Sequence, residues 1–294
     1  MIIITIPAYN EEKTIGRVIK EIKETMDKTS YKYRIHVLDD GSRDKTKIIA
    51  EKSGAVVFSH PINYGLAETF KEEIKRCLES KADIIVHTDA DGQYPALYIP
   101  KLIKEIENGY DLVLGSRFKG KIQSMSLTKK IGNIIFSKVV SQITKTKITD
   151  AQTGFRAFTK NAAEMPIISS HTYTQEQIIR AVKKKKIKIK EIPIYARKTR
   201  KSKLIKNPLE YAVKAGINLL RVYRDFEPLK FFGSISFFLF FLSFIITVYI
   251  IFRMGIYGLN ILDRLIPTLL LAVLFFLTGL QILLFGFLAD KQKI

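Results

Sequence analysis

The chain contains little or none of several residues and motifs that mark common protein classes. Its one cysteine, Cys77, cannot form a disulfide within the chain, which suits a reducing compartment. It contains no tryptophan. It also has no G-x-G-x-x-G fingerprint after the first expected strand and no G-x-x-x-x-G-K-[ST] loop. These absences argue against a dinucleotide-binding Rossmann enzyme and against a P-loop NTPase.

Acidic residues are scarce relative to basic ones. The chain has 28 Asp and Glu against 48 Lys and Arg, a formal net charge of +20. Such an excess indicates a polyanionic partner, which could be nucleic acid, an anionic membrane surface or a phosphorylated substrate. The opening residues, MIIITIPAYNEE, have no basic region before their apolar stretch. They therefore predict a strand and not a signal peptide.

Two long stretches near the C-terminus contain no charged residue. They cover 22 positions at 231–252 and 25 positions at 265–289, and each exceeds the roughly 20 residues that cross a bilayer core. The short link between them predicts a transmembrane hairpin. Lysine and arginine favour the cytoplasmic side, so the basic residues that flank the hairpin predict that residues 1–228 are cytosolic. The predicted localisation is the cell membrane, with two spans.

Apolar runs of strand length alternate with helical patterns over the first part of the chain. Such alternation predicts βαβ units and a mainly parallel, doubly wound α/β sheet flanked by helices. Beyond residue 120 the alternation weakens. The expected strands are 2–6, 34–38, 56–58, 84–88, 112–114, 155–158 and 187–192. The expected helices are 11–26, 44–52, 65–78, 97–106, 127–143 and 174–185.

Polar residues gather where four of these strands end. The sequences there are Pro7-Ala8-Tyr9-Asn10-Glu11, Asp39-Asp40-Gly41-Ser42-Arg43-Asp44, Asp89-Ala90-Asp91-Gly92-Gln93 and Gly115-Ser116-Arg117. The carboxyl ends of parallel strands lie along one edge, where open α/β sheets bind ligands. Side chains alternate along extended chain, so Asp89 and Asp91 point the same way. A cation between them would relieve their repulsion, although an isolated Asp-x-Asp is also typical of a solvated turn.

Seven sequence blocks carry a resemblance to a known family. They are IPAYNEEKTIG, VLDDGSRDKT, NYGLAETF, HTDADGQYP, VLGSRF, DAQTGFRAF and YTQEQ. In order and spacing they resemble family 2 glycosyltransferases of the GT-A fold, and within them the polyprenyl-phosphate (dolichyl-phosphate) sugar synthase branch. The resemblance covers residues 1–205. Without tryptophan, the Q-x-x-R-W motif of processive polysaccharide synthases is absent, which argues against a polymerase.

The resemblance implies roles for the polar strand ends. Asp89 and Asp91 would be the D-x-D pair that holds Mg²⁺ or Mn²⁺, with Gln93 as a further oxygen ligand. The metal would hold the diphosphate of a nucleotide-sugar while the glycosidic bond breaks. The base and ribose site would be lined by Pro7, Tyr9, Glu11, Asp39 and Asp40. A carboxylate such as Asp40 can accept an N–H from uracil or from guanine, so UDP- and GDP-sugars both remain open.

Other candidate residues each have an ordinary alternative. Arg117 is expected to contact a phosphate, although it could merely cap its strand. Asp150 and Gln152 would line an acceptor-sugar cleft or be ordinary loop residues, and Glu176 starts a helix whose dipole favours any carboxylate. With Asp91, these four residues form the predicted catalytic set. Further phosphate-binding cations are expected at Lys129, Arg200 and Lys203. A structural role is expected for His60, His87 and His171.

The most basic stretch, residues 183–206, has 12 Lys and Arg against one Glu. No nucleic-acid-binding motif accompanies it, whereas juxtamembrane basic clusters bind anionic headgroups at about 1 kcal/mol per residue. We therefore expect contact with anionic lipids and not with nucleic acid. Residues 197–203 are expected to close over the active site and hold phosphates. Residues 207–225 have apolar residues at helical spacing and are expected in the membrane interface, with a core-packed amphipathic helix as the alternative.

The sequence thus predicts three parts: a GT-A domain at 1–206, an interfacial helix at 207–228 and a two-span hairpin at 229–294. The predicted reaction is inverting transfer of one sugar from a nucleotide-sugar to polyprenyl phosphate at the cytoplasmic leaflet. The alternatives are transfer to a hydroxyl of a lipid-linked glycan or diacylglycerol, and a catalytically inactive domain that acts as a membrane adaptor. The residue types do not identify the sugar, the base, the choice between Mg²⁺ and Mn²⁺, or the oligomeric state.

Overall fold

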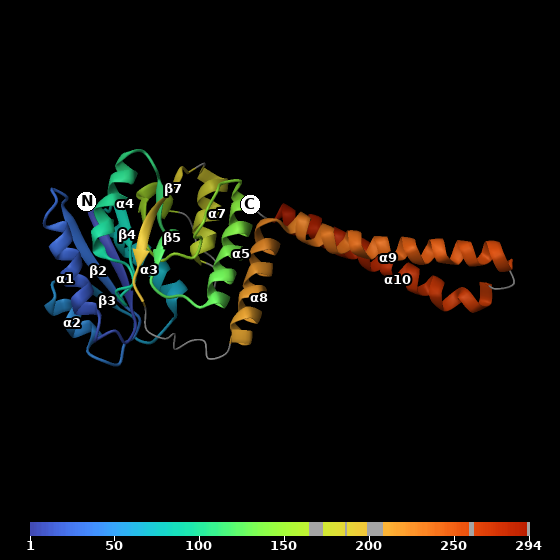
Figure 1. The fold of residues 1–294 in the computed structure, drawn as a ribbon, viewed down its shortest axis with the longest axis horizontal. Coiled ribbons are helices and arrows are strands. Elements are labelled where there is room, and N and C mark those ends of the chain that lie inside the picture. Colours follow the sequence, from blue (N-terminus) through green and yellow to red (C-terminus); the bar gives the residue numbers. More distant parts are fainter. Residues whose placement is uncertain (165–172, 186, 199–207, 259–261, 293–294) are drawn as a thin grey trace. The chain divides into compact units, whose positions relative to one another are not determined.

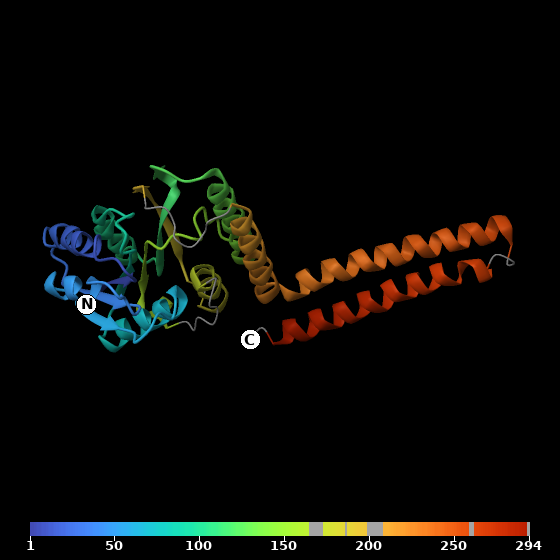
Figure 2. The ribbon, with the colours of Figure 1, turned by 90° about the horizontal axis from the view of Figure 1, so that it is seen from below.

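The chain folds into two compact units, Met1–Asn218 and Leu219–Ile294 (Figures 1 and 2). The structure is a computed structural model that describes residues 1–164, 173–185, 187–198, 208–258 and 262–292. The strands are β1 (Ile2–Ala8), β2 (Tyr33–Asp39), β3 (Val56–Ser59), β4 (Ile84–His87), β5 (Leu112–Ile122), β6 (Arg156–Thr159) and β7 (Ile189–Ala196). The helices are α1 (Ile15–Met26), α2 (Thr46–Lys52), α3 (Leu66–Glu79), η1 (Ala96–Tyr98), α4 (Ile99–Glu107), α5 (Leu127–Thr144), α6 (Lys160–Ala163), α7 (Tyr173–Lys185), α8 (Pro208–Phe226), α9 (Pro228–Tyr257) and α10 (Leu262–Lys291).

The first unit is built on a seven-stranded sheet in the order β3-β2-β1-β4-β6-β5-β7. The strand pairings are parallel except at β6, which runs antiparallel to its two neighbours, β4 and β5. The mainly parallel α/β sheet expected from the sequence is therefore confirmed. The reversed β6 places its amino end at the edge where β1, β2 and β4 have their carboxyl ends.

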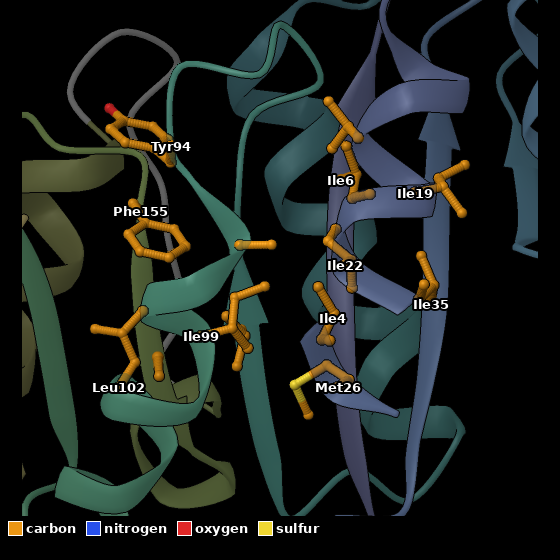
Figure 3. Close-up of a cluster of buried hydrophobic side chains, with 14 of the residues drawn as sticks. Ile4, Ile6, Ile19, Ile22, Met26, Ile35, Tyr94, Ile99, Leu102 and Phe155 are labelled. Carbon is orange, nitrogen blue, oxygen red and sulfur yellow. The ribbon is translucent and has the colours of Figure 1, made fainter. Parts of the chain in front are cut away.

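Helices cover both faces of the sheet (Figure 1). On one face, Ile4 and Ile6 of β1 belong to a buried cluster that includes Ile19 of α1 and Leu102 of α4 (Figure 3). Side chains alternate along a strand, so Thr5 points to the opposite face, where it bonds to α3. All of β1 is buried, because a parallel sheet is covered on both sides. This double burial explains the continuous apolar run from which the strand is predicted.

Strand β5 is longer than the sequence predicts. We expect a strand at 112–114 that ends at polar residues, but β5 continues to Ile122. Its second half pairs with β7, with Lys121 opposite Tyr195 after an irregularity that begins at Ser116. A partner strand far away in the sequence therefore stabilises this polar extension. The local sequence pattern of residues 112–122 does not indicate that β7 is the partner strand.

Helices α1 and α2 begin later than predicted, at Ile15 and Thr46. The residues before them join two strand ends. Asp44 accepts the backbone N–H groups of Thr46 at 2.9 Å and of Glu12 at 3.2 Å. The Thr46 hydroxyl accepts the backbone N–H of Glu11 at 2.8 Å. These bonds hold the loop after β1 against the loop after β2.

The second unit contains the paired helices α9 and α10 (Figure 2). The hydroxyls of Ser236 and Ser243 donate to the carbonyls of Gly279 at 2.6 Å and of Ala272 at 2.8 Å. These small residues are spaced by seven on each helix, which lets the two backbones approach closely. Both helices are long and apolar enough to cross a membrane, and only 17% of each apolar window is buried. This exposure distinguishes them from the core helices of a soluble protein.

Candidate active site

The carboxyl end of β4 carries the two aspartates of the Asp-x-Asp sequence. Asp91 Oδ1 accepts the backbone N–H of Gln93 at 2.9 Å. Gly92 between them has a φ of 75°, in the left-handed region that favours glycine. Burial, and then the charge of Asp91, raise the pKa of Asp89 to about 6. The two carboxylates are therefore close enough to repel each other, and a bound cation would reverse that repulsion.

The loop 150–154 reaches the same place because β6 is antiparallel. In the β4–β6 pair, His87 lies opposite Arg156, so the residues just before Arg156 lie beside the end of β4. A Cβ atom built on Gly154 would lie 2.7 Å from Asp89 Oδ1. The carboxylate of Asp89 therefore packs directly on the Cα of Gly154. The topology thus joins two sequence blocks that lie far apart in the chain.

Arg117 and Asp150 form a buried ion pair. The Nε and Nη2 atoms of Arg117 donate to the two oxygens of Asp150 at 2.7 and 2.8 Å. The backbone N–H of Arg117 donates to the same carboxylate at 3.0 Å, and both side chains are buried. Glu191 of β7 accepts the backbone N–H of Asp150 at 3.0 Å. The guanidinium of Arg117, which we expected to contact a phosphate, is thus bound by Asp150.

Glu176, in the first turn of α7, is also paired. Arg180 Nε donates to Glu176 Oε1 at 2.6 Å, one turn along the helix, and Glu176 is buried. Arg156 at the start of β6 donates to the carbonyl of Thr174 at 3.2 Å and to the carbonyl of Thr153. Arg156 therefore ties the first turn of α7, with Glu176, to the loop that precedes β6.

A pocket of about 460 Å³ lies where β1, β2 and β3 end. Asp39 is buried in its wall and accepts the backbone N–H of Ser42 at 3.2 Å. The ring of Tyr9 is 43% exposed. An aromatic face beside hydrogen-bonding groups suits a planar heterocycle with its ribose. The residues that line the pocket are Tyr9, Asp39, Gly41, Ser42, Arg43, Asp44, Lys47, Ile48, Ser59, His60, Pro61, Ile62 and Asn63.

Asp40 holds the loop 60–65, which forms part of this wall. Its Oδ1 and Oδ2 accept the backbone N–H groups of Tyr64 and Gly65, both at 2.9 Å. Gly41 has a φ of 69°, and a Cβ there would lie 2.5 Å from the backbone of the same loop. The structure therefore engages both oxygens of Asp40 within the protein. Of the two adjacent aspartates, Asp39 and not Asp40 lines the pocket.

The basic segment 197–203 begins beside the Asp-x-Asp loop. The backbone N–H of Arg197 donates to the Gln93 carbonyl at 2.9 Å. Its guanidinium donates to both oxygens of Glu21 at 2.7 and 2.9 Å. Arg197 therefore lies against the Asp-x-Asp loop, with its guanidinium paired to Glu21. Two phosphate ligands expected from the sequence, Arg200 and Lys203, lie outside the described residues.

The other expected site residues differ in exposure. Pro7 is buried within β1, and Glu11 is buried and accepts the Thr14 hydroxyl at 2.8 Å. Half-buried positions are taken by Gln93, Lys129 and Gln152. The geometry therefore brings the Asp-x-Asp pair, the loop 150–154 and the pocket of Asp39 to one edge of the sheet. Pro7 is not one of the residues that line this pocket.

Sequence reasoning assigned no site role to a pair of titratable residues behind Asp89. His87 Nδ1 lies 2.6 Å from the Gly154 carbonyl oxygen, and its Nε2 lies 3.3 Å from Glu73 Oε2. Burial would lower the pKa of His87, but the Glu73 carboxylate, then the Asp89 carboxylate and the Gly154 carbonyl, outweigh burial and raise it. The one sequence signal for this pair is a glutamate on the apolar face of an expected helix.

A family comparison matches this architecture. The model of glycosyl transferase family 2 matches residues 3–165. The chain belongs to this family. It is therefore an enzyme, a nucleotide-sugar-dependent glycosyltransferase.

Similar proteins extend the match beyond the family model. The chain is 36% identical over 229 residues to an uncharacterised protein of Methanocaldococcus jannaschii, covering 76% of this chain and 88% of that protein. It is 31% identical over 253 residues to a UDP-N-acetylglucosamine–dolichyl-phosphate N-acetylglucosaminyltransferase of Methanococcus voltae, covering 78% and 94%. It is 30% identical over 216 residues to a dolichyl-phosphate hexose transferase of Haloferax volcanii, covering 73% and 90%.

A solved structure shares the fold of this glycosyltransferase. It is a glucosyl-3-phosphoglycerate synthase from Mycobacterium tuberculosis, in complex with Mn²⁺, uridine diphosphate and phosphoglyceric acid. The TM-score is 0.60 at 21% sequence identity, and the match covers 76% of this chain and 77% of the other. The likeness shows the GT-A fold that the sequence resemblance implies.

Proposed function

We propose that this glycosyltransferase moves one sugar, with inversion, from a nucleotide-sugar to a polyprenyl phosphate at the cytoplasmic leaflet of a membrane. The names of two relatives, from Methanococcus voltae and Haloferax volcanii, support a lipid-phosphate acceptor. The observation that carries the proposal is the state of Asp150 and Glu176. Both carboxylates are engaged by arginine side chains, so neither is placed as a free general base.

A phosphate acceptor does not need a general base. A sugar hydroxyl is a poor nucleophile at neutral pH and requires proton removal. The second pKa of a phosphate monoester is about 6, so the acceptor is largely dianionic at pH 7 and attacks the anomeric carbon unaided. The arginine-paired carboxylates therefore suit a phosphate acceptor better than a hydroxyl of a lipid-linked glycan or of diacylglycerol.

The donor base and ribose would occupy the pocket beside Asp39. Tyr9 offers a ring face, and Asp39 offers a carboxylate in the pocket wall. Asp40 would act indirectly, by holding the loop 60–65. From this pocket the donor diphosphate would extend along the sheet edge to Asp89 and Asp91. A carboxylate accepts N–H donors from either uracil or guanine, so this geometry suits UDP- and GDP-sugars alike.

The residues at the end of β4 fit a hard divalent cation such as Mg²⁺ or Mn²⁺. Among the described residues, no three or more His, Cys, Asp or Glu side chains gather as a complete metal cage. Mg²⁺ is commonly held by one or two carboxylates together with substrate phosphates. Burial, and then the charge of Asp91, raise the pKa of Asp89, and a bound cation would offset both effects. Asp89, Asp91 and Gln93 would hold it, and it would stabilise charge on the departing diphosphate.

The remaining residues would shape the acceptor side. Arg117 is paired with Asp150, so it would hold that carboxylate in place and would act on the acceptor phosphate only through the part of its charge that Asp150 does not offset. Lys129, at the start of α5, is half-exposed and would contribute further positive charge. Arg200 and Lys203 remain proposals from the sequence alone.

A donor panel tests the proposed reaction. Full-length protein in detergent would be given UDP- and GDP-sugars with Mg²⁺ or Mn²⁺, with or without polyprenyl phosphate, and free nucleotide and glycolipid would be measured. We expect one donor to give glycolipid only when polyprenyl phosphate is present.

Glu176→Gln should keep at least about a tenth of the native transfer activity, since loss of an essential base costs 10²–10⁴-fold. Loss of transfer in Glu176→Gln with intact donor binding would favour a hydroxyl acceptor. No transfer to any lipid by the native protein would favour an inactive adaptor.

A topology experiment tests the membrane arrangement. We propose residues 1–206 as the cytosolic catalytic domain, residues 207–228 as an interfacial helix and α9 with α10 as the two spans. In intact cells, a cysteine at Tyr257 should react with an impermeant maleimide, and a cysteine at Lys291 should react only after lysis. The native Cys77 is buried and serves as the background. Equal labelling of both positions from one side would contradict the hairpin.

A further inference from the structure

The carboxylate of Asp89 rests on a glycine surface. A Cβ on Gly154 would lie 2.7 Å from Oδ1, 3.0 Å from Oδ2 and 3.2 Å from Cγ of Asp89. Contact at all three atoms means that the Asp89 carboxylate lies against the Cα of Gly154. Any larger residue at position 154 would displace this carboxylate. The terminal torsion of an aspartate is intrinsically broad, so this contact restricts an orientation that the side chain alone would not keep.

The Gly154 peptide is held from two sides. His87 Nδ1 lies 2.6 Å from its carbonyl oxygen, and because a carbonyl only accepts, Nδ1 carries the proton and donates. The backbone N–H of Gly154 donates to the Tyr94 hydroxyl at 3.4 Å. The Tyr94 ring stacks on Phe155 with centroids 5.2 Å apart and 11° between the planes (Figure 3). The glycine is thus fixed to β4 on one side and to the Asp-x-Asp loop on the other.

His87 is itself fixed by α3. Its Nε2 lies 3.3 Å from Glu73 Oε2, and both side chains are essentially inaccessible to solvent, at 1% and 0% exposure. The other oxygen of Glu73 accepts the Thr5 hydroxyl of β1 at 2.8 Å. Phe70 packs its ring edge-on against the imidazole at 5.1 Å. A chain of contacts therefore runs from the helix layer through the sheet to the Asp-x-Asp carboxylate.

We propose that His87 is a positioning residue of the metal site, which sets the orientation of the Asp89 carboxylate by holding the Gly154 peptide. Glu73 keeps the imidazole in place. Residues behind metal ligands commonly orient them, and their loss lowers metal affinity by about 10–100-fold. This inference rests on the proposed function, because it assumes that Asp89 binds a divalent cation.

Two substitutions separate the roles of the two imidazole nitrogens of His87. The amide nitrogen of asparagine stands near the position of Nδ1, so His87→Asn keeps a donor for Gly154 and loses the contact with Glu73. The amide nitrogen of glutamine stands near Nε2, so His87→Gln keeps the Glu73 contact and loses the bond to Gly154. A purely structural histidine predicts similar effects of both, whereas positioning through Gly154 predicts a difference.

The measurement is Mn²⁺ binding to the full-length protein in detergent, followed by the decrease of the free Mn²⁺ EPR signal, with and without UDP or GDP. We expect His87→Asn to bind Mn²⁺ within about 3-fold of the native protein, and His87→Gln to bind at least about 10-fold more weakly. His36 is the matched control: it is equally buried, lies on β2 and packs edge-on against Phe58. His36→Asn and His36→Gln should leave Mn²⁺ affinity unchanged.

Gly154→Ala gives an independent test that does not alter a histidine. The φ of Gly154 lies outside the left-handed region, so alanine fits the backbone and its methyl group displaces the Asp89 carboxylate. We expect Mn²⁺ affinity to fall at least about 10-fold while thermal unfolding shows a folded protein. Gly16→Ala is the control, because its Cβ would meet a methyl group of Ile49 at 3.1 Å, on α2 and not at the Asp-x-Asp loop.

The outcomes separate this inference from the function on which it rests. Native Mn²⁺ affinity in Gly154→Ala, or equal weakening in His87→Asn and His87→Gln, would overturn the positioning role and leave the metal site standing. Absence of Mn²⁺ binding by the native protein, even with nucleotide, would overturn the metal site and this inference together. If His87→Gln does not fold, the result with Gly154→Ala decides.

Discussion

Asp91→Ala is expected to lower the rate of sugar transfer by roughly a thousandfold or more, because charge stabilisation by a bound metal contributes several kcal/mol and each 1.36 kcal/mol is tenfold in rate. The fold should survive, since Asp91 is half-exposed at the end of β4 and its Oδ1 accepts one loop N–H, that of Gln93. The measurements are glycolipid formation with the active donor, Mn²⁺ binding and thermal unfolding of the same preparation.

Asp27→Ala is the matched control for this loss. Asp27 is an exposed aspartate that accepts the Tyr33 hydroxyl at 2.6 Å, at the far end of α1, and its replacement should leave transfer unchanged. Chelation of divalent cations by EDTA should abolish transfer by the native enzyme, and added Mn²⁺ or Mg²⁺ should restore it. Full activity in EDTA, or in the Asp91 variant, would refute the metal site at the end of β4.

Arg117→Ala is expected to destabilise the protein as well as to inactivate it. The substitution removes the charge partner of the buried Asp150 carboxylate and the two hydrogen bonds that the guanidinium donates to it, while the backbone N–H bond remains. Breaking a buried ion pair by removing one partner costs about 3–5 kcal/mol. For a domain of roughly 200 residues this corresponds to a drop in Tm of about 10 °C. The measurement is thermal unfolding of the full-length protein in detergent, with and without the substitution.

Arg224→Ala is the control for the Arg117 result, because the two pairs have the same Nε–Oδ distance of 2.7 Å but Arg224 and Asp225 are about half exposed. Exposed pairs contribute about 0–1 kcal/mol, so Tm should change little. The double variant Arg117→Leu/Asp150→Leu should recover part of the lost stability, because no buried charge is left unpaired. An unchanged Tm in Arg117→Ala, with only weaker acceptor binding, would restore the simpler role of Arg117 as a phosphate ligand.

The layers of the fold could be predicted from the sequence because local patterns report burial. β1 is covered on both faces and therefore appears as a continuous apolar run. α1 has apolar residues at helical spacing, and these are the residues that it buries against the sheet. The two uncharged stretches lie within α9 and α10. In each case the pattern depends on the chemistry of one segment and not on the identity of its neighbour.

The sequence also predicted that the polar strand ends lie close together, because parallel strands bring their carboxyl ends to one edge. It did not predict which of Asp39 and Asp40 lines the pocket. The two aspartates are adjacent and chemically identical, and only the position of the loop 60–65 commits the oxygens of Asp40 to the backbone N–H groups of Tyr64 and Gly65. In the same way, the engagement of Arg117 by Asp150 depends on where a loop thirty-three residues later arrives.

From the sequence alone we could predict most of the helices and strands, their alternation, the two long apolar helices near the C-terminus and the Asp-x-Asp pair at the end of a buried strand. Only the folded structure shows that β6 is antiparallel between β4 and β5 and that Gly154 packs on Asp89. It also shows that Glu73 and His87 lie behind this contact. The physical reason is that periodicity and composition record which face of a segment is buried. The direction and register of pairing between distant segments instead depend on packing across the whole sheet, which leaves no local pattern in the chain.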